Sequence, residues 1–184
     1  KIIPTFRPDA VTNIRGENFR QEIEKLSAAA DIDIHDFESY IRALEKRRAF
    51  FKEMGAVSTD QAVITPYTHE LPQSETDRIF KAALNGNVCD SDATAFEGHM
   101  LIEMARMSCN DQLVMQLHPG LLRNHNRIIY DKFGPDKGCD IPIQTEFTKN
   151  LHSMLNQYGN NSNFTLCLFT VDENTYSREL APLA

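Results

Sequence analysis

Side chains that could bind a carboxylate or move a proton follow several short apolar runs of this sequence. Arg7 follows the run at residues 2–6, and Pro8 after it favours extended backbone at Arg7. A guanidinium held in this way presents a fixed fork of N–H donors, which suits a carboxylate or a phosphate. A salt bridge between Arg7 and Asp9 at a turn explains the same residues, so both interpretations stay open at this point.

A second polar group follows the run at residues 113–118, which ends in His118. A histidine at the end of a buried strand is well placed to bind a metal or to transfer a proton near neutral pH. Pro119 and Gly120 predict a sharp turn after it, and the turn leads to further donors for an oxygen-rich ligand at Arg123, Asn124, His125 and Asn126. We therefore expect a functional role for His118.

Other polar residues have simpler structural interpretations. Residues 58–61 (Ser-Thr-Asp-Gln) could orient ligand hydroxyls, but capping of the next segment explains them as well. Asp172 could serve the site, yet we expect Asp172 or Asn174 to cap a helix that begins at Thr175.

Two further patterns lie on predicted helices. His99 and Glu103 are four residues apart and could share a metal, although such pairs are typical of ordinary helix neighbours. Three consecutive basic residues, 46–48, predict the solvated face of a long amphipathic helix. Nucleotide-binding and serine-hydrolase motifs such as G-x-G-x-x-G and G-x-S-x-G do not occur in the sequence.

The elements that must position these side chains follow from the apolar pattern. Strands are predicted at residues 2–6, 56–63, 113–118 and 164–171, and helices at 17–30, 33–54, 74–86, 90–107 and 145–158. Strands that alternate with helices predict a parallel sheet with right-handed crossovers, hence an α/β fold. Ligands bind at the C-terminal ends of such strands, so the candidate side chains should gather at one edge of the sheet.

Helix ends are also marked in the sequence. Asp33 is the expected N-cap of the long second helix, and Gly55 is its expected left-handed terminator. The sequence Ser-Glu-Thr-Asp from Ser74 resembles a capping box, and Thr145 is expected to open the last full helix. Residues 64–108 are longer than a simple crossover, so we expect a helical insertion there, with residues 1–63 and 109–184 in one β/α domain.

Composition restricts the class of protein. The chain has 184 residues, 41% of them hydrophobic and 24% charged, with a net charge of −7. These values are typical of a globular protein and argue against nucleic-acid binding by charge alone. The sequence offers no apolar stretch long enough for a membrane span and no signal segment. With only four well-separated cysteines, it is expected to be a reduced, cytoplasmic protein.

The two ends of the sequence differ from those of most domains. The chain starts in an apolar run without an initiator Met and stops in an apolar, helix-like segment. Natural domains usually begin and end in polar residues. We therefore expect the chain to be an internal piece of a longer protein, poorly folded when isolated because its sheet edges would be exposed.

Five segments together resemble the uronate isomerase (glucuronate isomerase) family of the amidohydrolase superfamily. They are IPTFRPD at residues 3–9, KRRAFF at 46–51, GAVSTD at 55–60, QLHPG at 116–120 and RNHN at 123–126. The resemblance runs in order along essentially the whole chain, and so it is more specific than any single motif. It implies a distorted (β/α)8 barrel of which this chain spans about strands three to six.

The resemblance also implies an activity and roles for individual residues. The family interconverts glucuronate with fructuronate, and galacturonate with tagaturonate, in bacterial sugar-acid catabolism. Arg7 matches an arginine that holds the substrate, and His118 matches the histidine of strand five on the metal side of the site. Arg123 and Asn124 match the polar loop after that strand. Gln61 stands where some relatives have histidine, which puts a catalytic role there in doubt.

A divalent metal such as zinc is implied for the whole enzyme, with ligands from strands one and eight that have no counterpart in this chain. The principal base is expected outside the chain as well. Two other classes remain open: a metal-dependent hydrolase on the same barrel, and a non-catalytic module whose helices at 64–108 bind a partner. Under the isomerase interpretation the partners are a small uronate and either the remaining barrel strands or a second copy.

Overall fold

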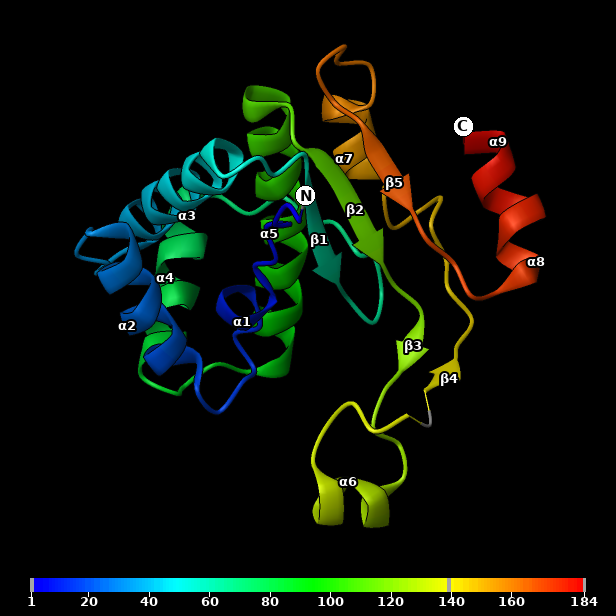
Figure 1. Cartoon of the computed structure of the whole chain (residues 1–184), viewed down its shortest axis with the longest axis horizontal. Helices are drawn as coiled ribbons and strands as arrows, with labels where there is room; N and C mark the ends of the chain where they lie inside the picture. Colours follow the sequence, from blue (N-terminus) through cyan, green and yellow to red (C-terminus); the bar gives the residue numbers. More distant parts are fainter. Residues whose placement is uncertain (1, 139, 184) are drawn as a thin grey trace.

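A three-stranded parallel sheet lies at the centre of the structure, a computed structural model that describes residues 2–138 and 140–183 (Figure 1). Its strands β1 (Ser58–Ala62), β2 (Val114–His118) and β5 (Leu166–Leu168) lie side by side in chain order. In the register, Thr59 pairs with Met115 and Leu117 pairs with Leu168. The predicted α/β class with a parallel sheet is confirmed.

Helices occupy most of the remaining chain. They are α1 (Asp9–Thr12), α2 (Phe19–Ala30), α3 (Phe37–Glu53), α4 (Gln73–Leu84), α5 (Asp90–Asp111), α6 (Arg127–Phe133), α7 (His152–Tyr158), α8 (Glu173–Thr175), the π-helix η1 (Tyr176–Leu180) and α9 (Ala181–Leu183). Two short antiparallel strands, β3 (Leu121–Leu122) and β4 (Ile141–Pro142), frame α6. Figure 1 shows α2, α3 and α4 gathered on one side of the sheet and the β3–α6–β4 arm extending away from it.

The strand predicted at residues 2–6 forms only a single bridge, in which Phe6 pairs in parallel with Thr59. The Phe6 N–H donates to the carbonyl of Ser58, and the Phe6 carbonyl accepts from Asp60. In a parallel ladder the next donors on this strand would be two residues earlier and two residues later. Both positions are proline (residues 4 and 8), which has no N–H, so the ladder stops on each side.

The two faces of the sheet have different surroundings. Thr59 and Gln61 of β1 and Met115 and Leu117 of β2 are buried beneath the helices. On the opposite face, Asp60 of β1 and Gln116 and His118 of β2 are only partly buried. One face of the sheet is therefore a packed core, and the other is accessible to a ligand or to further chain.

The core is completed by aromatic rings from three helices. Phe37 and Tyr40 of α3, Phe80 of α4 and Phe96 of α5 pack with ring centroids 4.9 to 6.4 Å apart. All four are buried. A partner-binding module would expose the apolar faces of α4 and α5, whereas these faces carry the core, which speaks against that alternative.

The long second helix, α3, begins later than predicted. Its N-cap is Asp36 and not Asp33, because Asp36 and Ser39 form a reciprocal capping box: the Asp36 carboxylate accepts from the Ser39 N–H at 2.8 Å. Hydrogen bonds from Ser39 hold the pKa of Asp36 below its usual value. Gly55 ends the helix with a φ of 97°, as predicted.

The capping box predicted from Ser74 is also wrong. Helix α4 starts at Gln73 without a side-chain cap, and the Thr76 hydroxyl donates to the backbone carbonyl of Gln73. The carboxylate of Asp77 instead accepts from the Phe37 N–H of α3. The residue types of a cap are present, but packing against α3 uses one of them elsewhere.

Thr145 does not open a helix. Residues 145–147 have no regular secondary structure, residues 148–151 form a turn, and α7 begins only at His152. The backbone N–H groups of Phe147 and Thr148 donate to the carboxylate of Glu179, at 2.6 and 2.9 Å. These contacts with a distant side chain hold the segment in a non-helical path.

Arg48 is the clearest departure from the sequence-based expectation of a solvated basic face. Lys46 is exposed, but Arg48 is completely buried between α3 and α5. Its Nε and Nη2 donate to the two carboxylate oxygens of Asp111 at 2.6 and 3.0 Å, and Nη2 also donates to Ser108. A buried charge needs such pairing, because an isolated guanidinium in the core would be strongly destabilising.

No helix in the described part of the chain is long and apolar enough to cross a membrane. Cys89 and Cys167 are exposed free thiols and Cys109 is a buried one. The fourth cysteine, Cys139, lies outside the described residues.

Candidate active site at the strand ends

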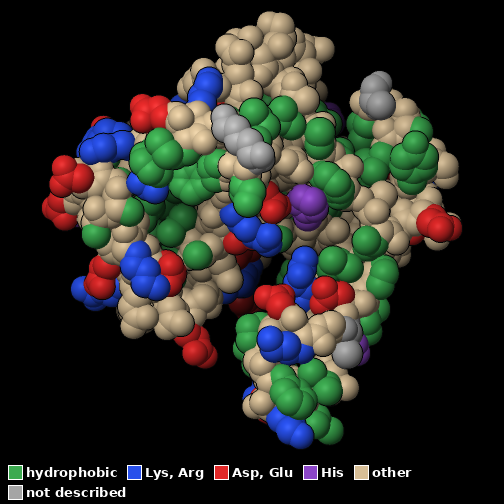
Figure 2. Space-filling model, viewed as in Figure 1, with side chains coloured by type: hydrophobic (Ala, Val, Ile, Leu, Met, Phe, Trp, Pro, Cys, Tyr) green, Lys and Arg blue, Asp and Glu red, His purple; other side chains and the backbone are tan. Residues whose placement is uncertain are grey.

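Arg7 and His118 lie together at the C-terminal edge of the sheet, as predicted from their positions after apolar runs. With Asp60, Arg123 and Phe169 they line an open hollow of about 180 Å³. In the space-filling view, a histidine near the centre lies beside acidic and basic side chains on one side and hydrophobic side chains on the other, above the recess that separates the main body from the lower arm (Figure 2). The hollow opens on the less covered face of the sheet.

Asp60 bridges the two predicted residues. Its Oδ1 lies 3.3 Å from Nε2 of His118, and its Oδ2 lies 3.2 Å from Nη1 of Arg7. The carboxylate therefore orients a ring nitrogen of the histidine and one edge of the guanidinium at the same time. Sequence reasoning treated Asp60 only as one of four polar residues; the available signal was a carboxylate inside a predicted strand, which needs a partner when partly buried.

Arg7 makes the salt bridge that the sequence offered as its structural interpretation. Its Nε donates to Oδ2 of Asp9 at 2.7 Å, and this hydrogen bond raises the pKa of Arg7 above its ordinary value. Oδ1 of Asp9 accepts from the Ala62 N–H at 3.1 Å, which ties the turn to β1. Because 52% of the Arg7 side chain remains exposed, the guanidinium can still bind an anion from the hollow.

His118 is held between two neighbours. Besides the contact with Asp60, its imidazole stacks on the ring of Phe169, with centroids 4.1 Å apart and an interplanar angle of 15°. About one third of the side chain is exposed. Phe169 gave no chemical signal in the sequence, where it was one apolar residue of a predicted strand.

The structure separates the two residues of the polar loop after β2. Arg123 lines the hollow, and its Nη1 lies 3.5 Å from Oδ2 of Asp140. Asn124 does not line the hollow; its side chain accepts from the Asp136 N–H at 3.0 Å and its φ is 55°. Asn124 thus shapes the loop that carries Arg123.

Gln61 lies away from the hollow. It is 3% exposed on the helix-covered face of the sheet, and its Nε2 donates to the Thr59 hydroxyl at 2.8 Å. A side chain on this face cannot reach a ligand beside His118, because successive residues of a strand point to opposite faces. The geometry favours a structural role for Gln61.

The described residues contain no group of three histidine, cysteine, aspartate or glutamate side chains that could hold a metal ion. His118 and Asp60 supply two such groups, which is fewer than the three protein ligands of a catalytic zinc site. His99 and Glu103 do not share a site either: Nδ1 of His99 accepts from the Leu71 N–H, and Glu103 pairs with Arg106.

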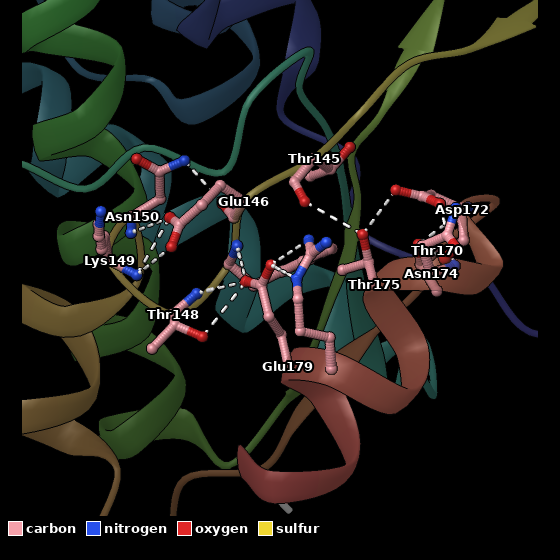
Figure 3. Close-up of polar contacts among 12 residues, drawn as sticks. Thr145, Glu146, Thr148, Lys149, Asn150, Thr170, Asp172, Asn174, Thr175 and Glu179 are labelled. Carbon is pink, nitrogen blue, oxygen red and sulfur yellow. Dashed lines mark hydrogen bonds and ion pairs between the residues drawn. The ribbon is translucent and has the colours of Figure 1, made fainter.

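A polar junction lies next to the loop after β5 (Figure 3). Asp172 caps a helix as expected, accepting from the Asn174 N–H at 3.0 Å, but the helix begins at Glu173 and not at Thr175. Thr175 is fully buried, with its hydroxyl 2.7 Å from Asp172 and 3.1 Å from the carbonyl of Thr145. Glu179 completes the junction through its contacts with residues 147 and 148.

Replacement of Glu179 with glutamine is expected to destabilise the protein. Burial alone would raise the pKa of Glu179, but hydrogen bonds from the Thr148 N–H, Arg178 and the Phe147 N–H outweigh it and lower the pKa to about 2. The carboxylate therefore stabilises the fold fully above about pH 4.5, and this contribution is lost as the pH falls toward 2. We expect Glu179→Gln to lower the free energy of unfolding by about 1.5–3 kcal/mol at pH 7.

Urea denaturation of the protein that contains this chain, at pH 7 and at pH 3, measures the effect. Glu173→Gln is the matched control, because Glu173 is an exposed glutamate six residues earlier in the same helical segment. The difference between the two variants should shrink at pH 3. Equal urea midpoints for both variants at pH 7 would contradict the assigned role.

Comparison with known proteins identifies the chain. The sequence profile of the glucuronate isomerase family matches residues 1–184. The uronate isomerase of Nostoc punctiforme is 50% identical over 100% of this chain, and that of Brucella canis is 46% identical over the same residues. The chain spans 39% of the length of each of these relatives.

Solved structures give the same result. The glucuronate isomerase of Caulobacter crescentus superposes with a TM-score of 0.93 at 41% identity, covering 98% of this chain and 38% of the other. The uronate isomerase of Thermotoga maritima superposes with a TM-score of 0.90 at 25% identity, covering 96% of this chain and 39% of the other. The family profile matches the whole of this chain, and the parallel sheet and the five segments that resemble the family agree with it. The chain therefore belongs to the glucuronate isomerase family.

Proposed function

We propose that this chain is the central segment of a uronate isomerase, which converts D-glucuronate to D-fructuronate and D-galacturonate to D-tagaturonate. The observation that carries the proposal is the Asp60 bridge between Arg7 and His118 at the strand ends of a family member. A uronate is a polyhydroxy aldehyde with a carboxylate at the far end. Arg7 and Arg123 offer cationic groups for such an anion, and His118 offers a group that can exchange a proton.

The reaction is an aldose–ketose isomerisation. A base removes the proton at C2, the electrons form a C1–C2 enediolate, and a proton is delivered to C1 while the oxygen at C2 becomes the carbonyl. In the proposed site, Arg7 binds the substrate carboxylate or an adjacent hydroxyl, and Arg123 adds positive charge. His118, with Nε2 directed at Asp60, acts as the imidazolium and donates a hydrogen bond from Nδ1 to the oxygen on which charge develops. The base that removes the C2 proton lies outside this chain.

The proposal also assigns the chain to one part of a larger barrel. The strands follow one another in chain order, as in an arc of a (β/α)8 barrel of which residues 1–63 and 109–184 are part. Residues 64–108 are the helical insertion, although α5 continues past them to Asp111 and leads directly into β2. The remaining barrel strands would cover the free sheet edges. Divalent-metal ligands, by the same resemblance, belong to those strands, and the cytoplasm is the proposed location.

The test is an assay of the full-length protein with D-glucuronate and D-galacturonate in D₂O, followed by NMR. An isomerase gives the ketose with deuterium at C1. His118→Asn is expected to lower kcat by about 100-fold, in the range of general acid–base contributions. His152→Asn is the matched control, since His152 is exposed on α7 and, among the described residues, its ring forms hydrogen bonds only with Asn156.

The absence of ketose would overturn the proposed activity, and an unaffected His118 variant would overturn the proposed role of that residue. A folded full-length protein that forms no ketose would not be an isomerase of these uronates, and hydrolysis of an ester or amide substrate by that protein would favour the competing hydrolase. Equal activities of His118→Asn and His152→Asn would remove His118 from the site.

A further inference from the structure

Phe169 is a large apolar residue in the wall of the polar hollow that holds Arg7, Asp60 and His118. It follows β5 directly, and its N–H donates to the carbonyl of Leu117, which continues the parallel ladder by one residue. Its side chain nevertheless remains 44% exposed and forms part of the wall of a polar hollow. Its main described ring contact is the stack on His118 at 4.1 Å.

We propose that Phe169 is a positioning residue, which fixes the plane of the His118 imidazole for the isomerisation proposed above. An imidazole on a strand can rotate about two side-chain torsions. The contact between Asp60 and Nε2 restrains one direction within the ring plane, and the parallel stack restrains the plane itself. Together the two contacts leave a single orientation of the ring at the wall of the hollow.

The segment that carries Phe169 is itself anchored. Next to it, the Thr170 hydroxyl accepts from the Asp172 N–H at 3.1 Å, and Asp172 reaches the buried Thr175 (Figure 3). Thr175 in turn contacts the carbonyl of Thr145. The turn that holds Phe169 against His118 is thus tied to the body of the protein by a chain of polar contacts.

The same junction supports the turn after His118. A Cβ at Gly120 would lie 2.5 Å from the Thr145 hydroxyl, and the φ of Gly120 is 88°, so this position requires glycine. Thr145 therefore lies against the turn after β2 and, through Thr175, against the turn after β5. Both partners of the stack are built on one rigid support, which is the arrangement that a precise ring orientation needs.

The inference rests on the proposed function, and steady-state kinetics of the full-length protein test it. Phe169→Leu keeps an apolar side chain but removes the ring face, and should lower kcat about tenfold, the upper range of an aromatic pair. KM should change less than about threefold, because Arg7 and Arg123 still bind the substrate. Phe169→Tyr keeps the ring and should retain the wild-type kcat.

Tyr176→Leu serves as the matched control, because Tyr176 is a 63% exposed aromatic residue outside the hollow. In a His118→Asn background, Phe169→Leu should have no further effect on kcat/KM, since a positioning residue acts only through its partner. The inference would be overturned if Phe169→Leu lowered kcat/KM by the same factor in the wild-type and His118→Asn backgrounds. It would also be overturned if Phe169→Tyr lowered kcat as much as Phe169→Leu does.

A second measurement does not depend on activity. In protein labelled with ¹³C-histidine, the ring protons of His118 should be shifted upfield by the Phe169 ring and should move downfield in Phe169→Leu. Unchanged His118 resonances would show that the stack is absent and would overturn the inference. If the wild-type protein forms no ketose but the His118 resonances do move in Phe169→Leu, the proposed function is wrong and the stacking of Phe169 on His118 is still confirmed.

Discussion

Arg48→Met is expected to lower the free energy of unfolding by about 3–5 kcal/mol, the largest stability effect of any single substitution considered. The reason is the bidentate pair between the buried Arg48 and the partly buried Asp111, whose carboxylate also accepts from the Leu113 N–H just before β2. Methionine fills much of the same volume but leaves the Asp111 carboxylate without its cation. Urea denaturation of the full-length protein measures the change as a lower midpoint.

Arg47→Met is the matched control for this prediction. Arg47 is the adjacent basic residue, half-buried, and donates one hydrogen bond to the carbonyl of Ala29 at 3.2 Å. Its replacement should cost no more than about 1 kcal/mol. The double variant with Asp111→Asn should recover part of the loss, because the uncompensated charge is then removed. Indistinguishable midpoints for the two single variants would refute the prediction.

The second large effect is expected on activity. In the full-length protein, Arg7→Ala should lower kcat/KM for D-glucuronate about 100-fold, which corresponds to roughly 3 kcal/mol for charge-assisted contacts with the substrate. Removal of the guanidinium also leaves Asp60 without one of its two partners. Arg7→Lys keeps the charge but not the fork of donors, so it should restore only part of the activity.

Arg20→Ala is a suitable control for Arg7→Ala, since Arg20 is an exposed residue of α2 whose ion pair within the described part of the chain is with Glu24 on the same helix. Initial rates over a range of substrate concentrations separate kcat from KM. An Arg7→Ala enzyme as active as Arg20→Ala would show that the substrate carboxylate is bound by other residues.

The positions of Arg7 and His118 could be predicted because each follows an apolar run and parallel strands end at a common edge. Their bridge could not be predicted, because it depends on the register that sets Ala62 opposite His118 and brings Asp60 between the two. Register is decided by the packing of the buried face, which local sequence does not reveal. Gln61 could be assigned to the buried face only after that register was known.

Helix ends were harder to predict than helices. Gly55 was recognised as a terminator because a positive φ is a local property. Thr145 and Arg48 were misinterpreted because their environments are set by residues far along the chain, Glu179 for the segment after Thr145 and Asp111 for Arg48. A charged side chain that reaches a distant partner overrides the local pattern, and composition alone gives no sign of it.

The chain order of the strands also has a consequence for folding. Phe6, β1, β2 and β5 are neighbours in the sheet in the same order in which a ribosome synthesises them. Each strand can therefore join an edge that already exists, and no later segment has to insert between two earlier ones. Arg7 can meet Asp60 before residue 118 has been translated, so the candidate site assembles from its N-terminal side.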